Sequence, residues 1–122
     1  VPPQSGAEAV DFLGVPTYTT LAPAHIAALT GASLLLCYAL PLGKQRYRLA
    51  MERIEVPRGE TVRETSLALT RKLSLALETA IRGRPEAWAW WLKRWNIRPE
   101  GAPGEWPSYS TPEKWFRPAK DI

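Results

Sequence analysis

The chain contains few of the residue types from which catalytic and metal centres are usually built. Its 122 residues include one cysteine, Cys37, and one histidine, His25, which excludes an internal disulfide framework and a Cys/His zinc cluster. No apolar run approaches the roughly 20 residues of a membrane-spanning helix, and the longest, around Ala32–Leu40, has the length of a strand. Glycine-rich phosphate loops and paired carboxylates are also absent. We therefore expect neither a bound metal nor a cofactor.

Neither the thiol nor the imidazole has a catalytic neighbourhood in the sequence. Cys37 lies in the middle of the apolar run, where a thiol is typically a buried, inert, small hydrophobe. His25 has no Ser, Cys or acid at catalytic spacing, so we expect a core or surface histidine. Residue chemistry alone therefore predicts no self-sufficient active site.

The formal net charge of +4 conceals an uneven distribution along the chain. Residues 1–43 contain two acids and no Lys or Arg, and residues 99–122 contain three basic and four acidic residues. Residues 44–98 contain thirteen basic and six acidic residues, a net charge of +7. This segment can attract nucleic acid, an anionic membrane surface, a phosphorylated substrate or an acidic carrier protein. A solvated surface in which Arg stems cover apolar area is the plainer alternative.

Apolar residues make up 45% of the chain, enough for the core of one modest domain or part of a larger one. Their spacing predicts a first helix over Leu21–Leu29, with Thr19 or Thr20 as its N-cap and Gly31 at its end. A short apolar stretch, Val10–Val15, precedes this helix.

Two strands are predicted next, Ala32–Leu40 and Gln45–Val56, joined by a hairpin loop over 41–44. In the second strand Tyr47, Leu49 and Met51 alternate with more polar residues, which predicts that their face is packed and the other is wet. The alternation changes phase after Met51, which suggests a bulge near Glu52–Arg53.

A capping box at Thr61–Glu64 predicts a long amphipathic helix of about twenty residues that ends near Arg82–Arg84. Pro85 is expected to begin a further helix, which carries a cluster of tryptophans: Trp88, Trp90, Trp91 and Trp95. The predicted fold class is α/β, with a strand pair flanked by at least three helices and completing a larger mixed sheet. We expect the proline-rich tail, residues 102–122, to be extended over a surface.

The tryptophan cluster allows three interpretations. Trp88, Trp91 and Trp95 share one face of the predicted helix, and that face could pack on the preceding helix and strands. A cation-flanked Trp helix is also typical of a membrane interface. A stacking platform for single-stranded nucleic acid is a weaker third possibility, because such platforms usually lie on sheets.

Four blocks of the chain follow one another in a recognisable order. They are Val1–Gln4, then Phe12–Gly14 with Thr17–Thr19, then Leu29–Ala32, and last Glu78–Pro99 with its Ile-Arg, Pro-Glu and Trp/Arg-rich close. Together they resemble the C-terminal half of the lipid A biosynthesis acyltransferases, the lauroyl/myristoyl transferases of the lysophospholipid acyltransferase superfamily. The resemblance extends to about residue 101 and implies that 1–101 is the C-terminal portion of an acyltransferase domain.

The resemblance implies an enzyme at the cytoplasmic face of the bacterial inner membrane. It would move an acyl chain from an acyl carrier protein or CoA thioester to a hydroxyl of a phosphoglycolipid. In the family, the His of a His-x4-Asp motif is the base and the Asp orients it. That motif is absent here, since Thr30 stands five positions after His25. We therefore expect a missing N-terminal half and no activity from this chain alone.

The resemblance also implies two sets of site residues. Those expected to bind substrate are Phe12, Gly14, Thr19, Lys44, Arg46 and Arg48. Those expected to contact the membrane or carrier are Arg82, Trp90, Arg94 and Arg98. The family usually has an Arg near the end of the apolar strand, where this chain has Ala39 and Leu40. We expect Lys44, Arg46 or Arg48 to recognise the phosphate in its place.

The acyltransferase interpretation excludes nucleic acid as a partner. The alternative is a small basic module that binds anionic lipid or nucleic acid without catalysis.

Overall fold

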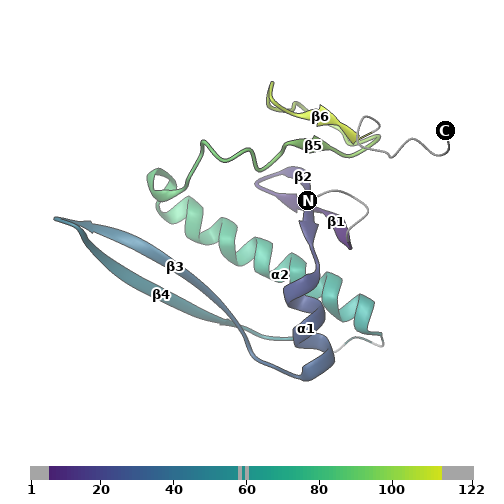
Figure 1. The fold of residues 1–122 in the computed structure, drawn as a ribbon, viewed down its shortest axis with the longest axis horizontal. Helices are drawn as coiled ribbons and strands as arrows, with labels where there is room; N and C mark the ends of the chain where they lie inside the picture. Colours follow the sequence, from purple (N-terminus) through teal and green to yellow (C-terminus); the bar gives the residue numbers. More distant parts are fainter. Residues whose placement is uncertain (1–5, 58, 60, 114–122) are drawn as a thin grey trace, which may run out of the picture.

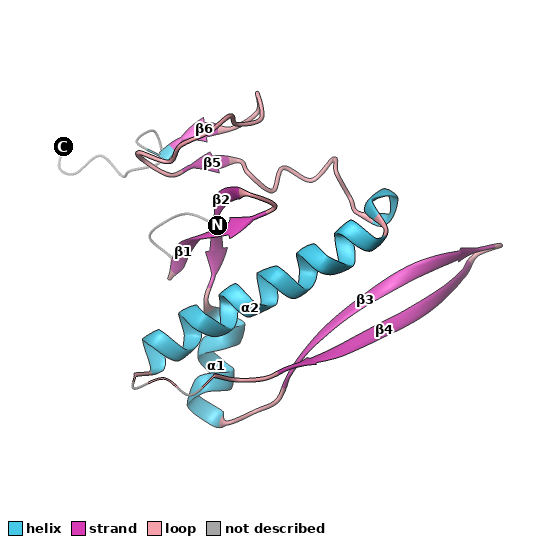
Figure 2. Ribbon diagram, turned by 180° about the vertical axis from the view of Figure 1, so that it is seen from behind, coloured by secondary structure: helices cyan, strands magenta, loops and turns pink. Residues whose placement is uncertain are grey.

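A computed structural model describes residues 6–57, 59 and 61–113, and it is organised around one long helix (Figure 1). This helix, α2 (Val62–Gly83), lies between a long two-stranded ribbon on one side and two smaller strand pairs on the other (Figures 1 and 2). A shorter helix, α1 (Ala22–Thr30), packs against it. The mixed α/β character is confirmed, but the described residues hold two α-helices where at least three were predicted. None of the helices in this part of the chain is long and apolar enough to cross a membrane.

The start of α2 and the end of α1 lie where their capping residues predict, but the N-cap predicted for α1, Thr19 or Thr20, is wrong. Thr61 is extended, and its Oγ1 accepts a hydrogen bond from the backbone N–H of Glu64 at 3.1 Å, which satisfies one free donor of the first turn of α2. Gly31 ends α1 in the left-handed region at φ +71°, and its N–H donates to the carbonyl of Ala27. The N-cap position of α1 is Leu21, and Thr20 Oγ1 accepts instead from the N–H of Ala22.

A first hairpin, β1 (Ala7–Phe12) and β2 (Val15–Thr20), occupies the region that was predicted only as an apolar stretch. Its two-residue turn, Leu13 and Gly14, has φ values of +52° and +83°, which match the twist of a tight hairpin. The Leu13 N–H donates to Glu78 Oε1 at 2.6 Å, so α2 holds the strained turn in place.

The ribbon is formed by β3 (Leu34–Gly43) and β4 (Arg46–Ile54), and its tip extends beyond α2 (Figure 2). The predicted bulge near Glu52–Arg53 is wrong, because the pairing runs unbroken there and is irregular only between Pro41 and Gly43. The core lies at its other end, where the buried side chains that pack together are Ala24, Ala27, Ile54 and Leu69.

The face of the second ribbon strand that was predicted to be packed is exposed. Tyr47, Leu49 and Met51 are 68%, 62% and 65% exposed, although they were expected to be packed. Cys37, opposite Met51, is likewise exposed and not the buried thiol that was predicted. The reason is that α2 covers the other face, through Leu36 and its neighbours, and no described residue covers this one.

The prediction of a helix that begins at Pro85 is wrong. A single 3₁₀ turn, Pro85–Ala87, is followed by turns, because the Pro85 carbonyl accepts the Trp88 N–H and the Trp90 indole N–H. The chain then forms β5 (Ile97–Arg98), which pairs in parallel with β6 (Thr111–Pro112). In the predicted extended tail, residues 102–122, the described strand is Thr111–Pro112, and it follows a bend and a turn; residues 114–122 lie outside the described residues.

Candidate functional site

Phe12 is the centre of an aromatic cluster that joins the first hairpin to residues 88–95, which we term the tryptophan segment. Its side chain is fully buried, with ring centroids of Trp88 and Trp95 at 6.0 and 5.7 Å and both rings tilted. The Arg94 guanidinium carbon lies 5.0 Å from the Phe12 centroid, a cation–π distance. The three residues from segment 88–95 therefore enclose one side chain from β1.

Arg94 is fastened to β2 by hydrogen bonds to neutral acceptors. Its Nη1 donates to Thr17 Oγ1 and to the Tyr18 carbonyl, both at 3.3 Å, and its Nη2 donates to Thr19 Oγ1 at 2.9 Å. The buried Thr17 hydroxyl in turn donates to the Arg94 carbonyl at 2.8 Å. Burial lowers the pKa of Arg94, and no described carboxylate forms an ion pair with it. The result is a part-buried cation without a counter-charge among the described residues.

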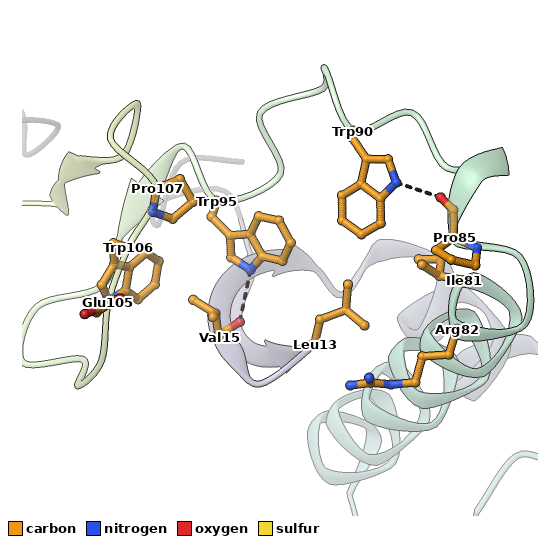
Figure 3. Close-up of a pocket in the computed structure, with 10 residues that line it drawn as sticks. All are labelled: Leu13, Val15, Ile81, Arg82, Pro85, Trp90, Trp95, Glu105, Trp106 and Pro107. Atoms are coloured by element: carbon orange, nitrogen blue, oxygen red, sulfur yellow. Dashed lines mark hydrogen bonds between the residues drawn. The ribbon is translucent and has the colours of Figure 1, made fainter.

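One cavity beside this cluster is the tryptophan cavity, of about 810 Å³ (Figure 3). Trp90 and Trp95 form part of its wall, and their indole N–H groups are held by the carbonyls of Pro85 at 2.6 Å and Val15 at 3.2 Å. Trp106 contributes a third ring, whose buried Nε1 has no hydrogen-bond partner among the described residues. The full lining is Leu13, Val15, Ile81, Arg82, Pro85, Trp90, Trp95, Glu105, Trp106 and Pro107.

A second cavity, which we term the Arg94 cavity, has a volume of about 190 Å³ and lies between α1, α2, β3 and the first hairpin. Its polar lining comes from Arg94, Thr19, Thr20, Thr70 and Ser74. Its apolar lining is Phe12, Pro23, Ala24, Leu36, Leu73 and Leu77. It thus combines one cation and four hydroxyl groups with a hydrocarbon wall.

The structure divides the residues that were expected to bind substrate. Phe12 and Thr19 line the Arg94 cavity, whereas Gly14 is exposed in the hairpin turn and lines neither cavity. The three cations of the ribbon, by contrast, are exposed at its tip and line neither cavity: Lys44, Arg46 and Arg48.

The residues expected at the membrane or carrier are also separated. Arg82 and Trp90 line the tryptophan cavity, where Trp90 is 49% exposed and Arg82 is exposed. Arg98 is exposed on β5 beside a crevice that also includes Glu100 and Glu113. Arg94 lies inward, against β2, so it has little surface to offer a membrane.

Two residues of the site were missed from the sequence. Ser74 is buried in the wall of the Arg94 cavity, and Glu78 holds the Leu13–Gly14 turn one helical turn further along α2. The signal for Ser74 was present, because Ser66, Thr70 and Ser74 recur every four residues and interrupt the apolar pattern of that helix.

The described residues supply no metal site and no organised acid–base pair. They contain no cluster of three or more His, Cys, Asp or Glu side chains that could hold a metal ion. His25 is exposed on α1, and no described acid forms a hydrogen bond or ion pair with it. These residues can bind and orient a ligand.

Comparison with known proteins finds a match to a family of stated activity. Residues 3–97 match the family described as "Bacterial lipid A biosynthesis acyltransferase". The match includes the first hairpin, both helices, the ribbon and the tryptophan segment up to the start of β5. Neither a curated protein nor a solved structure matches the chain.

Proposed function

The chain belongs to the bacterial lipid A biosynthesis acyltransferase family, and on that premise we propose that it forms part of an enzyme that acylates a phosphoglycolipid. The donor is the thioester of an acyl carrier protein or of CoA, and the acceptor is a hydroxyl of a lipid A-type molecule. The family match over residues 3–97 is the observation that carries this proposal.

The chemistry is the exchange of a thioester for an oxygen ester. The acceptor hydroxyl oxygen attacks the thioester carbonyl, a C–O bond forms, the C–S bond breaks, and the thiol leaves with the proton that the base removed. No atom of this reaction requires a metal or an organic cofactor. The described residues contribute binding and orientation, which keep the reacting carbon and oxygen close together.

The tryptophan cavity is suited to bind the acyl chain. Its volume of about 810 Å³ is within the range of small-molecule sites, and its walls are formed largely by Trp, Leu, Val, Ile and Pro side chains. Burial of methylene groups there contributes about 0.8 kcal/mol each. Arg82 and Glu105 are the only charged groups in this lining, which leaves most of it suited to hydrocarbon.

The base is proposed to come from a segment that carries the family's His-x4-Asp motif, because the one histidine of this chain is followed by Thr30 at the fifth position. The ribbon offers surfaces on which that segment can pack. Each of its strands has one described partner, so both outer edges are open, and its outer face is apolar and exposed. We propose that the sheet continues there into the larger mixed sheet predicted from the sequence.

We place the enzyme at the cytoplasmic face of the inner membrane, where its acceptor resides and where an anionic surface meets it. The exposed cations of the ribbon tip, with Arg82, Trp90 and Arg98, support contact with anionic lipid or an acidic carrier protein. Arg94 no longer supports this contact, because its guanidinium is directed at β2.

The test is acyl transfer with and without the proposed second part. The chain is purified alone and together with a His-x4-Asp segment from a member of the family, and labelled acyl thioester and phosphoglycolipid are supplied to both. We expect transfer only from the combination, and none when the His of the added segment is changed to Ala. Transfer by the chain alone would refute the proposal. Binding to anionic vesicles or single-stranded DNA without transfer would favour the non-catalytic alternative.

A further inference from the structure

We propose that the Arg94 cavity is a phosphate-binding site, in which Arg94 and Ser74 hold the oxygens of a phosphate group. This inference deepens the proposed function. It rests on that function only for the identity of the molecules that carry the phosphate. It differs from the sequence prediction, which assigned Arg94 to the membrane and phosphate recognition to the ribbon cations.

Part of the Arg94 guanidinium is not used by the hydrogen bonds of the described residues. A guanidinium has five N–H groups, and the described hydrogen bonds of Arg94 use two on Nη1 and one on Nη2. One N–H on Nε and one on Nη2 have no partner among the described residues. These two nitrogens form one edge of the planar group, and such an edge binds two oxygens of an oxyanion at once.

Ser74 supplies a free hydroxyl to the same cavity. Ser74 is 6% exposed and lines the cavity, and no hydrogen bond joins its hydroxyl to another described residue. Its neighbour on α2, Thr70, donates to the Ser66 carbonyl at 2.8 Å, so the absence of such a bond sets Ser74 apart. The Ser74 oxygen is not among the buried side-chain atoms that lack a partner in the described residues, so it opens onto the cavity and is free to donate to a ligand there.

The positive charge of Arg94 also favours an anionic ligand. Arg94 is part-buried with no described carboxylate beside it, and an unpaired cation in apolar surroundings attracts an anion strongly. The hydroxyl of Thr20 adds a donor, because its oxygen accepts from the Ala22 N–H and its proton is not used by a described acceptor. Donors on both α2 and the first hairpin suit a tetrahedral phosphate better than a planar carboxylate.

Two molecules of the proposed reaction carry a phosphate, and the site could take either. The acceptor is a phosphorylated glycolipid, and the thioester arm of the donor is a phosphopantetheine. A cavity of about 190 Å³ is far larger than the ~30 Å³ share of one water molecule, so it has room for a phosphate and the first atoms esterified to it.

The experiment follows the Arg94 Nε–H resonance by NMR in the ¹⁵N-labelled chain, without any acyl donor. Inorganic phosphate is titrated first, then phosphopantetheine and glucosamine 1-phosphate, and then acetate as the carboxylate control. We expect a saturable shift with phosphate, no shift with acetate, and tighter binding by whichever organophosphate is the natural source. A shift with acetate alone, or none with any phosphate, overturns the inference.

Three variants separate binding from structure. Arg94→Lys keeps the charge but loses the two-donor edge, and Ser74→Ala removes one hydroxyl; each is expected to weaken phosphate binding about tenfold or more. Arg71→Lys is the matched control, because Arg71 is exposed on α2 and lines neither cavity. Equal affinity in all three refutes the site. If Arg94→Lys does not fold, Ser74→Ala still decides the question.

Failure of the proposed phosphate site can be distinguished from failure of the proposed function. Phosphate binding is measured without transfer, and transfer is measured with a separate segment. A chain that binds no phosphate but completes an active transferase overturns only this inference.

Discussion

Replacing Arg94 with Met tests whether this residue holds the tryptophan segment onto the first hairpin. The change removes three hydrogen bonds to β2 and a cation–π contact with Phe12, while the methionine keeps much of the apolar stem. At about 1 kcal/mol for each hydrogen bond and a similar amount for the ring contact, the loss is roughly 4 kcal/mol. Relief of an unpaired, part-buried cation offsets some of this. We expect a net loss of about 2–3 kcal/mol in the free energy of unfolding.

Urea unfolding followed by tryptophan fluorescence measures this loss, because Trp88 and Trp95 both contact Phe12. With a typical urea dependence of about 1–3 kcal/mol per molar for small proteins, the midpoint should fall by roughly 1–2 M. Arg71→Met is the control, since Arg71 is exposed, and its effect should stay within about 0.5 kcal/mol. A midpoint for Arg94→Met equal to that of the control would refute the reasoning.

A double-mutant cycle identifies the contact responsible. Thr19→Val removes the hydroxyl that accepts from Arg94 Nη2 at 2.9 Å while preserving the shape of the side chain. If the bond contributes, the cycle of Arg94→Met and Thr19→Val gives a coupling of about 0.5 kcal/mol or more. Zero coupling would mean that the hydrogen bond adds nothing to stability.

Three further predictions concern single positions. Thr61→Ala should lower the free energy of unfolding by about 1 kcal/mol in a urea titration, and Thr61→Ser should restore it, because the N-cap oxygen serves the Glu64 N–H. Trp95→Phe should cost about 1 kcal/mol more than Trp106→Phe in the same titration, because only the Trp95 indole has a described acceptor. Cys37 should react with a thiol reagent in the native protein within a few-fold of its rate in urea; strong protection would contradict the exposed outer face of the ribbon.

The helices and the ribbon could be located from the sequence because their signals are local. The capping box at Thr61, the glycine after α1 and the apolar run of β3 each concern residues within a few positions of one another. The first hairpin was missed because its turn, Leu13–Gly14, lacks the usual Asn-Gly or Asp-Gly signal. Its positive φ at Leu13 is supported by Glu78, which is 65 residues away.

The tryptophan segment shows where periodicity misleads. Trp88, Trp91 and Trp95 have helical spacing, yet two of them surround Phe12 and the third is 81% exposed. Large rings reach their partners from several backbone conformations, so their spacing alone does not define a helix. The family resemblance is nevertheless confirmed, because it depends on the order of residues and not on their secondary structure.

The sequence by itself determined the family, the approximate extent of both helices and the position of the ribbon. Only the tertiary structure decided which face of the ribbon is covered, where the cavities lie and what surrounds Arg94. The physical reason is the range of the interactions. Caps and turns join residues a few positions apart, whereas Arg94 meets Thr17 and Thr19 across more than seventy residues, and packing of α2 against both hairpins is what brings them together.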